Sequence, residues 1–406
     1  MWFRSACRML AAILTIGWSS AWAADLPGQA FSIAPDKLPR PHATPAVDNT
    51  SKKIARPPGA RLEVPEGFTV SAFARGLTDA RWMTVAPNGD VFLAQPDLGR
   101  VVLLRPSADG SHAARISVFA RGLDRPHGLA LYEQSLYIAD VNAVWRLPYK
   151  SGVLKNHAKP QHMFDTTPHE PTGHFTRDIV FDSQGNLFLA IGALENLGED
   201  PPSRAAVQKI APDGTRTIFA SGLRDPVGMA FYPGTDELYV TVNERDGLGD
   251  ALPPDYFTRI RKDEFFGWPY AYTGPHPDPD YGAKRPDLIA RSRTPDVLFE
   301  AHSAPLGLVF YDASQFPAEY KGDAFVALHG SWNRSHPTGY KVVRVKFRNG
   351  RPQNAYEDFL TGFWDGGTSP AQVWGRPVGL AVARDGSLLI ADDTGGAVWR
   401  VAYAGK

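Results

Sequence analysis

Hydrophobic and polar residues alternate along this chain in six copies of one short pattern. Each copy is an apolar run, then a polar turn that usually holds Gly with Asn or Asp, then a second apolar run, as in WMTVAPNGDVFLAQ. The pattern predicts a β-hairpin, because Gly, Asn and Asp tolerate the backbone conformations of tight turns. The six copies start near Trp82, Pro126, Thr176, Pro226, Pro305 and Pro377.

Most copies are followed by a third strand-like run that carries Arg or Lys, for example GRVVLLR and GAVWRV. A unit of several strands that recurs every ~40–50 residues is typical of a propeller blade. We therefore predict an all-β fold, a six-bladed β-propeller, for residues 62–406. A β-sandwich whose hairpins resemble one another by chance is the alternative that the pattern leaves open.

Two segments precede the repeats. Residues 1–23 begin with Arg4 and Arg8, continue with the apolar run MLAAILTIGW and end in Ala-Trp-Ala. These are the features of a secretory signal peptide, and an uncleaved membrane anchor is the alternative. Residues 24–61 contain seven prolines and few large apolar side chains, so we expect an extended N-terminal arm or linker there.

The number of cysteines and the net charge exclude several classes of protein. Cys7 is the only cysteine, and it lies within the predicted signal peptide, so the mature chain has no thiol and no disulfide. The 43 Lys and Arg residues balance 43 Asp and Glu residues, which does not indicate nucleic-acid binding. No later apolar stretch is long enough for a transmembrane segment. An exported chain without cysteine fits the bacterial periplasm.

Candidate functional residues stand where predicted inner strands begin, because a propeller carries its function on loops around the central channel. His174 opens the third repeat and is either a general base or a hydrogen-bonded structural histidine. Arg224 opens the fourth repeat, Arg376 the sixth and His127 the second. Basic groups at one blade position converge on one end of the channel, where they suit a multiply anionic ligand; arginines that cap surface loops are the alternative.

Two further segments have the composition of ligand sites. The run NERDGLGD includes Asp246 and Gly247, and its oxygen atoms suit Ca²⁺, although a solvated turn has the same composition. Trp332, Asn333 and Arg334 combine an aromatic ring, an amide and a cation, as the wall over a planar ligand would; core packing is the alternative for the tryptophan. The chain lacks a Gly-x-Ser-x-Gly elbow, a phosphate-binding loop and a dinucleotide-binding fingerprint, which argues against a serine hydrolase, an ATPase and a nicotinamide enzyme.

Several segments resemble the soluble quinoprotein sugar dehydrogenases of the glucose/sorbosone dehydrogenase family, most closely its sorbosone dehydrogenase branch. The most specific are GHFTRDIVFDSQGNLFLAIG, GLRDPVGMAFYP, VNERDGLGDALPPDYF, HGSWNRSHPTGYKVVRV and WGRPVGLAVARDGSLLIADD. The resemblance covers roughly Val64 to Val401. It implies a six-bladed propeller that binds pyrroloquinoline quinone (PQQ) and Ca²⁺ at the channel mouth and oxidises a sugar or a sugar-derived aldehyde or lactol. Electrons would pass to a quinone or a soluble carrier.

The resemblance also implies roles for individual residues. His174 matches the catalytic base, and Arg224 matches the arginine beside the reacting carbonyl of the cofactor. Arg376 matches a partner of a PQQ carboxylate, and Asn333 and Arg334 lie near the position of a cofactor-binding lysine. With His127 from its blade position and Trp332 from its aromatic ring, these are the cofactor-binding candidates. Asp246 and Gly247 match the positions that offer main-chain carbonyls to Ca²⁺.

The sequence departs from the glucose-oxidising members at two positions. Gly173 replaces an acidic residue before the base, and Asp225 replaces an asparagine after Arg224. Both departures count against glucose as the substrate. Two other functions stay open at this point: a lactonase-type propeller hydrolase with Ca²⁺ in the channel, and a non-catalytic propeller that binds carbohydrate.

Overall fold

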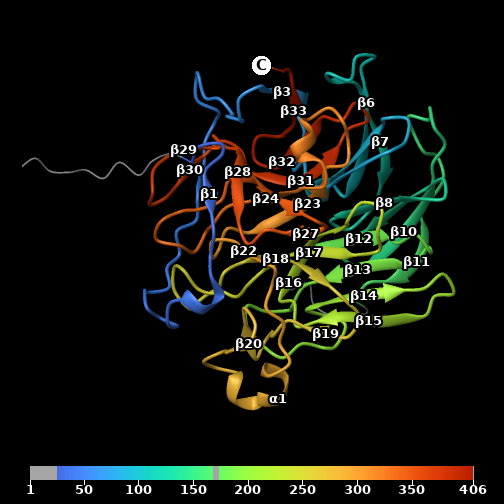
Figure 1. Cartoon of the computed structure of the whole chain (residues 1–406). Coiled ribbons are helices and arrows are strands. Elements are labelled where there is room, and N and C mark those ends of the chain that lie inside the picture. Colours follow the sequence, from blue (N-terminus) through green and yellow to red (C-terminus); the bar gives the residue numbers. More distant parts are fainter. Residues whose placement is uncertain (1–24, 168–172, 406) are drawn as a thin grey trace, which may run out of the picture.

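The computed structural model describes residues 25–167 and 173–405, and their regular secondary structure consists almost entirely of β-strands (Figure 1). The one α-helix in that part of the chain is the single turn α1 (Pro286–Ile289). The predicted signal peptide lies outside the described residues. Within them, no helix has both the length and the apolar character that crossing a membrane requires.

Six sheets of four or five strands follow one another along the chain. The first comprises β4 (Met83–Val85), β5 (Val91–Gln95), β6 (Arg100–Pro106) and β7 (Ala113–Arg121), and the second β8 (Gly128–Tyr132), β9 (Ser135–Ala139), β10 (Ala143–Pro148) and β11 (Gln161–Asp165). The third comprises β12 (Arg177–Phe181), β13 (Leu187–Ile191), β14 (Ala206–Ile210), β15 (Arg216–Ser221) and β19 (Glu264–Phe265). The fourth comprises β16 (Asp225–Phe231), β17 (Leu238–Asn243), β18 (Tyr256–Ile260) and β22 (Val297–Leu298).

The last two sheets take strands from both ends of the chain. The fifth comprises β23 (Pro305–Phe310), β24 (Ala324–Leu328), β25 (Lys341–Val345), β28 (Tyr356–Leu360) and β1 (Ala30–Phe31). The sixth comprises β31 (Pro377–Val382), β32 (Leu388–Asp392), β33 (Ala397–Tyr403) and β3 (Phe68–Arg75). In the sixth sheet, β3 pairs antiparallel with β33, so the start and the end of the chain are joined in one sheet.

Each of the six predicted hairpins is the first antiparallel strand pair of one of these sheets. The first strands β4, β8, β12, β16, β23 and β31 contact one another in a closed ring. Glycines of the repeat allow this close approach. A Cβ at Gly128 would lie 2.2 Å from the Arg177 carbonyl oxygen, and one at Gly307 would lie 2.2 Å from that of Val378. The recurrence of glycine in the repeat therefore follows from the packing of the inner strands.

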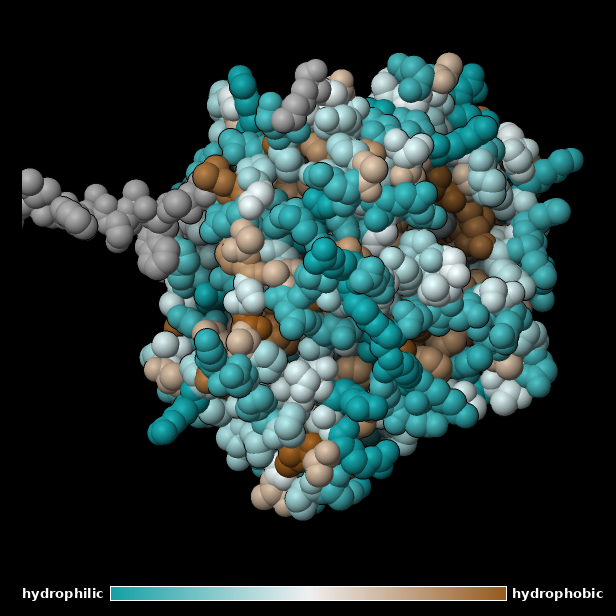
Figure 2. All heavy atoms as spheres, in the orientation of Figure 1, coloured by the Kyte–Doolittle hydropathy of each residue, from teal (hydrophilic) through white to brown (hydrophobic). Residues whose placement is uncertain are grey.

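The hydrophobic core is divided into layers between neighbouring sheets. One cluster joins Phe73 and Leu389 of the sixth sheet to Met83 and Leu93 of the first, and further clusters join each of the other neighbouring pairs. The second strands β5, β9, β13, β24 and β32 are buried along their whole length, as expected for strands covered on both faces. The surface in Figure 2 is largely hydrophilic, with apolar residues in small separate patches.

The segment before β3 lies along the propeller-like body. Strand β1 extends the fifth sheet by pairing with β28, and Asp25 forms an ion pair with the buried Lys341 at 3.1 Å. Strand β2 (Lys52–Lys53) pairs with β30 (Gln372–Val373), which also pairs with β29 (Trp364–Gly366). The remaining short elements are β20 (Ala271–Tyr272), β21 (His276–Pro277), β26 (Phe347–Arg348), β27 (Arg351–Pro352) and the 3-10 helices η1 (Pro35–Lys37), η2 (Pro96–Leu98), η3 (Gly282–Lys284) and η4 (Ala318–Tyr320).

Candidate active site

A polar cavity of about 370 Å³ opens among the loops at one end of the ring of inner strands. Because each inner strand begins where its partner strand ends, residues before β12, β16 and β23 meet residues after β17 and β24 at this end. A cavity of this size accommodates a small organic ligand. We call it the His174 cavity; its lining residues are Arg81, Gly173, His174, Phe175, Thr176, Arg224, Asp225, Asn243, Glu244, Asp246, Asp255, His302, Ala304, Leu306, Trp332 and Asn333.

His174 is held in one orientation by the main chain. Its Nδ1 lies 2.7 Å from the carbonyl oxygen of Ala193. A carbonyl only accepts hydrogen bonds, so Nδ1 carries the hydrogen, and Nε2 of the neutral ring has a free lone pair. Nε2 lies 4.0 Å from Oδ2 of Asp225, which also lines the cavity. The side chain is 25% exposed and lines the cavity, so a bound ligand can reach it.

Arg224 is buried in the wall of the cavity and is fixed by oxygen atoms. Its Nε donates to the carbonyl of Asn196 at 3.2 Å, and its Nη2 donates to Oδ1 of the same residue at 3.1 Å. Its Nη1 donates to the carbonyls of Glu244 at 2.9 Å and Asn243 at 3.4 Å. Four of the five guanidinium hydrogens are thereby used, and one on Nη2 remains for a ligand.

Two buried carboxyl groups near Arg224 have perturbed acidity. Burial raises the pKa of Glu244 to about 8, with the charge of Asp255 adding to this effect and that of Arg224 opposing it. Burial also raises the pKa of Asp255 to about 6, against the hydrogen bonds donated by the backbone N–H groups of Glu244 and Ala304. Groups with shifted pKa values that line one cavity are typical of functional sites.

Asp246 lies at the same cavity and is stabilised in its charged form. Burial disfavours that form, but hydrogen bonds from His302 and Asn333 and the charge of Arg224 lower the pKa of Asp246. His302 Nδ1 lies 3.4 Å from Oδ1 of Asp246, and Nε2 lies 2.9 Å from the Gly249 carbonyl oxygen. Burial opposes the charge on His302, yet these two contacts raise the pKa of its imidazole.

Trp332 and Asn333 line the His174 cavity, as the predicted wall requires. Trp332 is 50% exposed, an unusual state for a large aromatic side chain, and Asn333 donates its Nδ2 hydrogen to Oδ1 of Asp246. Arg334 does not line the cavity, because its Nη1 is paired with Oε1 of Glu300 at 3.2 Å.

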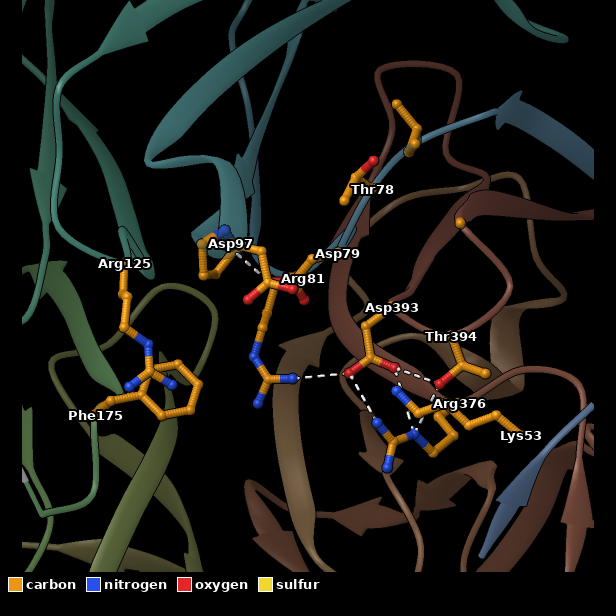
Figure 3. A pocket seen from close by; sticks show the side chains of 13 residues that line it. Lys53, Thr78, Asp79, Arg81, Asp97, Arg125, Phe175, Arg376, Asp393 and Thr394 are labelled. Carbon is orange, nitrogen blue, oxygen red and sulfur yellow. Dashed lines mark hydrogen bonds and ion pairs between the residues drawn. The ribbon is translucent and has the colours of Figure 1, made fainter.

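Arg376 lies in an adjoining cavity of about 430 Å³, which shares Arg81 and Phe175 with the first (Figure 3). We call it the Arg376 cavity. Asp393 pairs there with Nη1 of Arg81 at 2.8 Å and with Nε of Arg376 at 3.4 Å. Despite burial, these arginines and His329 hold the pKa of Asp393 far below its usual range. Arg125 stacks on Phe175 with its guanidinium carbon 3.8 Å from the ring centroid.

His127 and Gly247 line neither cavity. The His127 ring is fully buried, with its centroid 4.4 Å from that of Trp82, and burial lowers the pKa of this imidazole well below its ordinary value. Gly247 adopts a positive φ of 99° next to Asp246. The structure therefore brings five predicted residues together at one cavity, places Arg376 in the adjoining one, and leaves His127, Arg334 and Gly247 outside both.

The oxygen atoms of the His174 cavity suit a cation. Oδ1 of Asp225 and Oε1 of Glu244 are buried and have no hydrogen-bond donor. Buried polar atoms are normally paired, so a bound ion or water is the usual partner of such oxygens. Among residues 25–167 and 173–405, no three His, Cys, Asp or Glu side chains are arranged to hold a metal ion by themselves. A cation there would take further ligands from carbonyl oxygens or from a second ligand molecule.

Sequence reasoning did not single out Glu244, Asp255, His302 or Asp393 as site residues. Glu244 stands two residues before Asp246 in the acidic segment NERDGLGD, so the composition of that segment could have indicated Glu244 as a site residue. Asp255 and His302 reach the cavity only through the loops before β18 and β23, and Asp393 through the turn after β32. Nothing in the local pattern marks those three.

Fold and site together define a class of protein: strands arranged around a ring, with a polar small-molecule cavity at one end. A family model described as glucose/sorbosone dehydrogenase matches residues 133–336, and one described as TrAA12-like matches residues 285–404. The first covers about half of the chain. The chain therefore belongs to the glucose/sorbosone dehydrogenase family.

Individual proteins extend this likeness over most of the chain. A protein of Borreliella burgdorferi without an assigned activity is 31% identical over 357 residues, which cover 84% of this chain and 91% of that protein. The holo form of the PQQ domain of pyranose dehydrogenase from Coprinopsis cinerea superposes with a TM-score of 0.71 at 21% identity, covering 87% of this chain and 100% of that one. A calcium structure of the AA12 enzyme of Trichoderma reesei gives a TM-score of 0.70 at 19% identity with the same coverage. The chain therefore shares the β-propeller fold of these proteins.

Proposed function

We propose that this protein is a PQQ- and Ca²⁺-dependent dehydrogenase built on a six-bladed β-propeller. Its substrate would be a sugar or a sugar-derived aldehyde or lactol, of the sorbosone or aldose kind. The observation that carries the proposal is the pairing of His174 and Arg224 at one cavity: an imidazole with a free Nε2 lone pair and a guanidinium with a free Nη2 hydrogen. Membership of the sugar dehydrogenase family supports this assignment.

The residues of the two cavities fit the cofactor chemically. PQQ is a flat tricarboxylate, and the cavities supply an exposed aromatic ring in Trp332 and the cations Arg81, Arg224 and Arg376. Guanidinium groups pair well with carboxylates. Ca²⁺ would be held at Asp246, with the unpaired oxygens of Asp225 and Glu244 in the lining of the same cavity. Gly247, the other predicted Ca²⁺ position, follows Asp246 in the chain but lies outside the cavity lining. When bound, PQQ supplies a quinone that accepts two electrons as a hydride, and Ca²⁺ supplies a Lewis acid.

The chain's own residues would act on the substrate and on the developing charge. Nε2 of His174 would accept the proton of the substrate hydroxyl. The carbon that bears this hydroxyl would give up a hydride to the quinone, which leaves a carbonyl product. The Ala193 carbonyl keeps the imidazole in the tautomer that this step needs. The remaining Nη2 hydrogen of Arg224 would stabilise negative charge that develops on oxygen.

The chain's location and electron acceptor complete the proposal. The signal-like residues 1–23 support export to the periplasm, and the acceptor would be a quinone or a soluble carrier.

Titration of purified, metal-stripped protein with PQQ, with and without Ca²⁺, tests the proposal. The quinone absorbance and the melting temperature would be followed. We expect saturable binding that requires Ca²⁺, and turnover of aldoses or sugar aldehydes with a redox dye. Absence of binding under both conditions would reject the dehydrogenase and direct the search to lactones and carbohydrate ligands.

A further inference from the structure

Residues 42–54 contact three loops at the end of the ring that holds the His174 cavity. We call this segment the mouth strap. Its first contact is with the loop after β17: the backbone N–H of His42 donates to the Leu248 carbonyl at 2.8 Å, and that of Asp250 donates to Oγ1 of Thr44 at 2.8 Å. Gly249 permits the approach, since a Cβ there would lie 2.8 Å from the carbonyl oxygen of Thr44.

Asn49 makes the central contacts of the mouth strap. Its backbone N–H donates to the Trp332 carbonyl at 2.7 Å. Its side-chain amide donates to the carbonyls of Arg334 at 2.9 Å and Thr368 at 2.8 Å, with that of Ser335 at 3.3 Å. The Asn49 side chain thus joins the loop after β24 to the loop between β29 and β30, two loops that are far apart in the sequence.

The end of the mouth strap is fixed by strand pairing. The backbone N–H of Lys52 donates to the Ala371 carbonyl at 2.7 Å, and that of Ile54 donates to the Val373 carbonyl at 2.8 Å. Strand β2 therefore anchors the strap beside Asn49, and the position of the amide is set from both sides.

The loop that Asn49 holds carries two lining residues of the His174 cavity. Trp332 is bonded to Asn49 through its own carbonyl, and Asn333, the next residue, bonds the carboxylate of Asp246. Asp250 reinforces the arrangement, because its Oδ1 accepts a hydrogen bond from the backbone N–H of Ser335 at 2.9 Å. Release of the Arg334 and Thr368 carbonyls would leave the half-exposed Trp332 with fewer restraints on its backbone.

We propose that Asn49 is a positioning residue: from outside the cavity it fixes the loop that places Trp332 and Asn333 against the bound ligand. Its effect on catalysis rests on the proposed function, whereas its effect on the loop does not. A loop that is ordered before binding costs less to order upon binding, so loss of the amide should weaken cofactor affinity.

The test compares Asn49→Asp and Asn49→Ala with wild type. Aspartate keeps the size of the side chain and the backbone hydrogen bond to Trp332. It replaces the side-chain NH₂ group, which donates to the loop carbonyls, by an oxygen atom that accepts. Asn156→Ala is the matched control, because Asn156 also donates its amide to a carbonyl, that of Pro148 at 2.7 Å, in a surface loop away from either cavity. Hydrogen exchange of residues 329–340, PQQ affinity in the presence of Ca²⁺, and kcat and KM would be measured.

We expect faster exchange in residues 329–340 and a PQQ affinity about 5- to 30-fold lower in both Asn49 variants, the range for loss of one or two neutral hydrogen bonds. Asn156→Ala should change neither. Unchanged exchange would overturn the proposal, and so would faster exchange with unchanged affinity and KM. If Asn49→Ala fails to fold, Asn49→Asp, which keeps the size of the side chain, carries the test through exchange of residues 329–340. If wild type binds no PQQ, the proposed function fails, while the exchange comparison still decides whether Asn49 fixes the loop.

Discussion

Replacing His174 by alanine should abolish most of the turnover and spare most of the cofactor affinity. A general base contributes about 10²- to 10⁴-fold to rate, which corresponds to roughly 2.7–5.4 kcal/mol of transition-state stabilisation. The imidazole is anchored by one side-chain hydrogen bond, from Nδ1 to the Ala193 carbonyl. Loss of such a bond costs only about 0.5–1.5 kcal/mol of stability. The catalytic loss should therefore exceed any loss of folding stability.

The assay is steady-state reduction of a redox dye by protein loaded with PQQ and Ca²⁺, with kcat and KM measured separately. Cofactor affinity and the melting temperature would be determined for the same samples. His162→Ala is the matched control: Nε2 of this exposed histidine lies 2.8 Å from Oδ1 of Asp165 on β11, and the residue lines neither cavity. It tests whether loss of any histidine paired with a carboxylate lowers turnover.

Two results would refute the reasoning. A His174→Ala variant with kcat within about threefold of wild type would remove His174 from the role of base, since the expected loss is at least ~10²-fold. A variant that loses PQQ affinity and turnover in equal measure would make His174 a binding group. Equal losses in the His162→Ala control would point to a general effect on the fold.

Three further predictions concern the cofactor and the core. Arg376→Ala should weaken PQQ binding by roughly 2–5 kcal/mol, as truncation of one partner of a buried charge pair does, and an unchanged titration would exclude a contact with the cofactor. Treatment with a Ca²⁺ chelator should abolish PQQ binding and added Ca²⁺ should restore it; equal affinity in both states would remove Ca²⁺ from the site. Burial raises the pKa of Asp178 to about 8 from an ordinary value of 3.8, so the folded protein keeps a proton there that the unfolded chain loses. Stability due to this group is complete below pH ~4 and falls as pH rises toward ~8, by at most about 1.4 kcal/mol per unit, and Asp178→Asn should remove that slope from urea unfolding measured at pH 5 to 8. Identical slopes for the two proteins would contradict the assigned titration.

The sequence predicted the strand pairs well because the signal is local. Each hairpin repeat carries its own turn residues and its own apolar runs, and the first strand of each sheet begins within two residues of the predicted start, as with Pro305 and Pro377. The closure of the sixth sheet is not a local property. Strand β3 pairs with β33, which lies at the other end of the chain. No pattern within residues 68–75 predicts this pairing.

The N-terminal segment shows a second limit of composition. Its many prolines predict an extended chain, and in the described part the regular elements are β1, η1 and β2. Prolines do not show what an extended chain lies against. The pairing of β1 with β28 and the contacts of Asn49 depend on carbonyls that loops far away in the sequence leave available.

One part of the candidate site was predictable from the blade pattern, and another part, Asp246, Trp332 and Asn333, from the composition of two loop segments. His174 and Arg224 stand at the beginnings of inner strands, and both line one cavity. Arg376 has the equivalent position but lies in the adjoining cavity, because its strand β31 stands opposite β12 in the ring of inner strands. Arg334 could not be placed by pattern, since the presence of Glu300 as its partner depends on how two loops cross.

The distribution of charge across the two cavities argues for one elongated ligand. The His174 cavity is lined by four carboxyl groups, those of Asp225, Glu244, Asp246 and Asp255, against two arginines, Arg81 and Arg224. Two of the carboxyl groups have buried oxygens without a donor. The Arg376 cavity is lined by four cations, those of Lys53, Arg81, Arg125 and Arg376, and by three carboxyl groups, those of Asp79, Asp97 and Asp393, so cations are in slight excess there. Arg81 and Phe175 belong to both, so the acidic end and the basic end are continuous. A flat ligand that binds Ca²⁺ at one end and carries carboxylates at the other matches this polarity. A neutral sugar alone does not require the cations of the Arg376 cavity, and a metal ion alone does not require the exposed ring of Trp332. The geometry therefore favours the metal and the anionic cofactor bound together over either one alone.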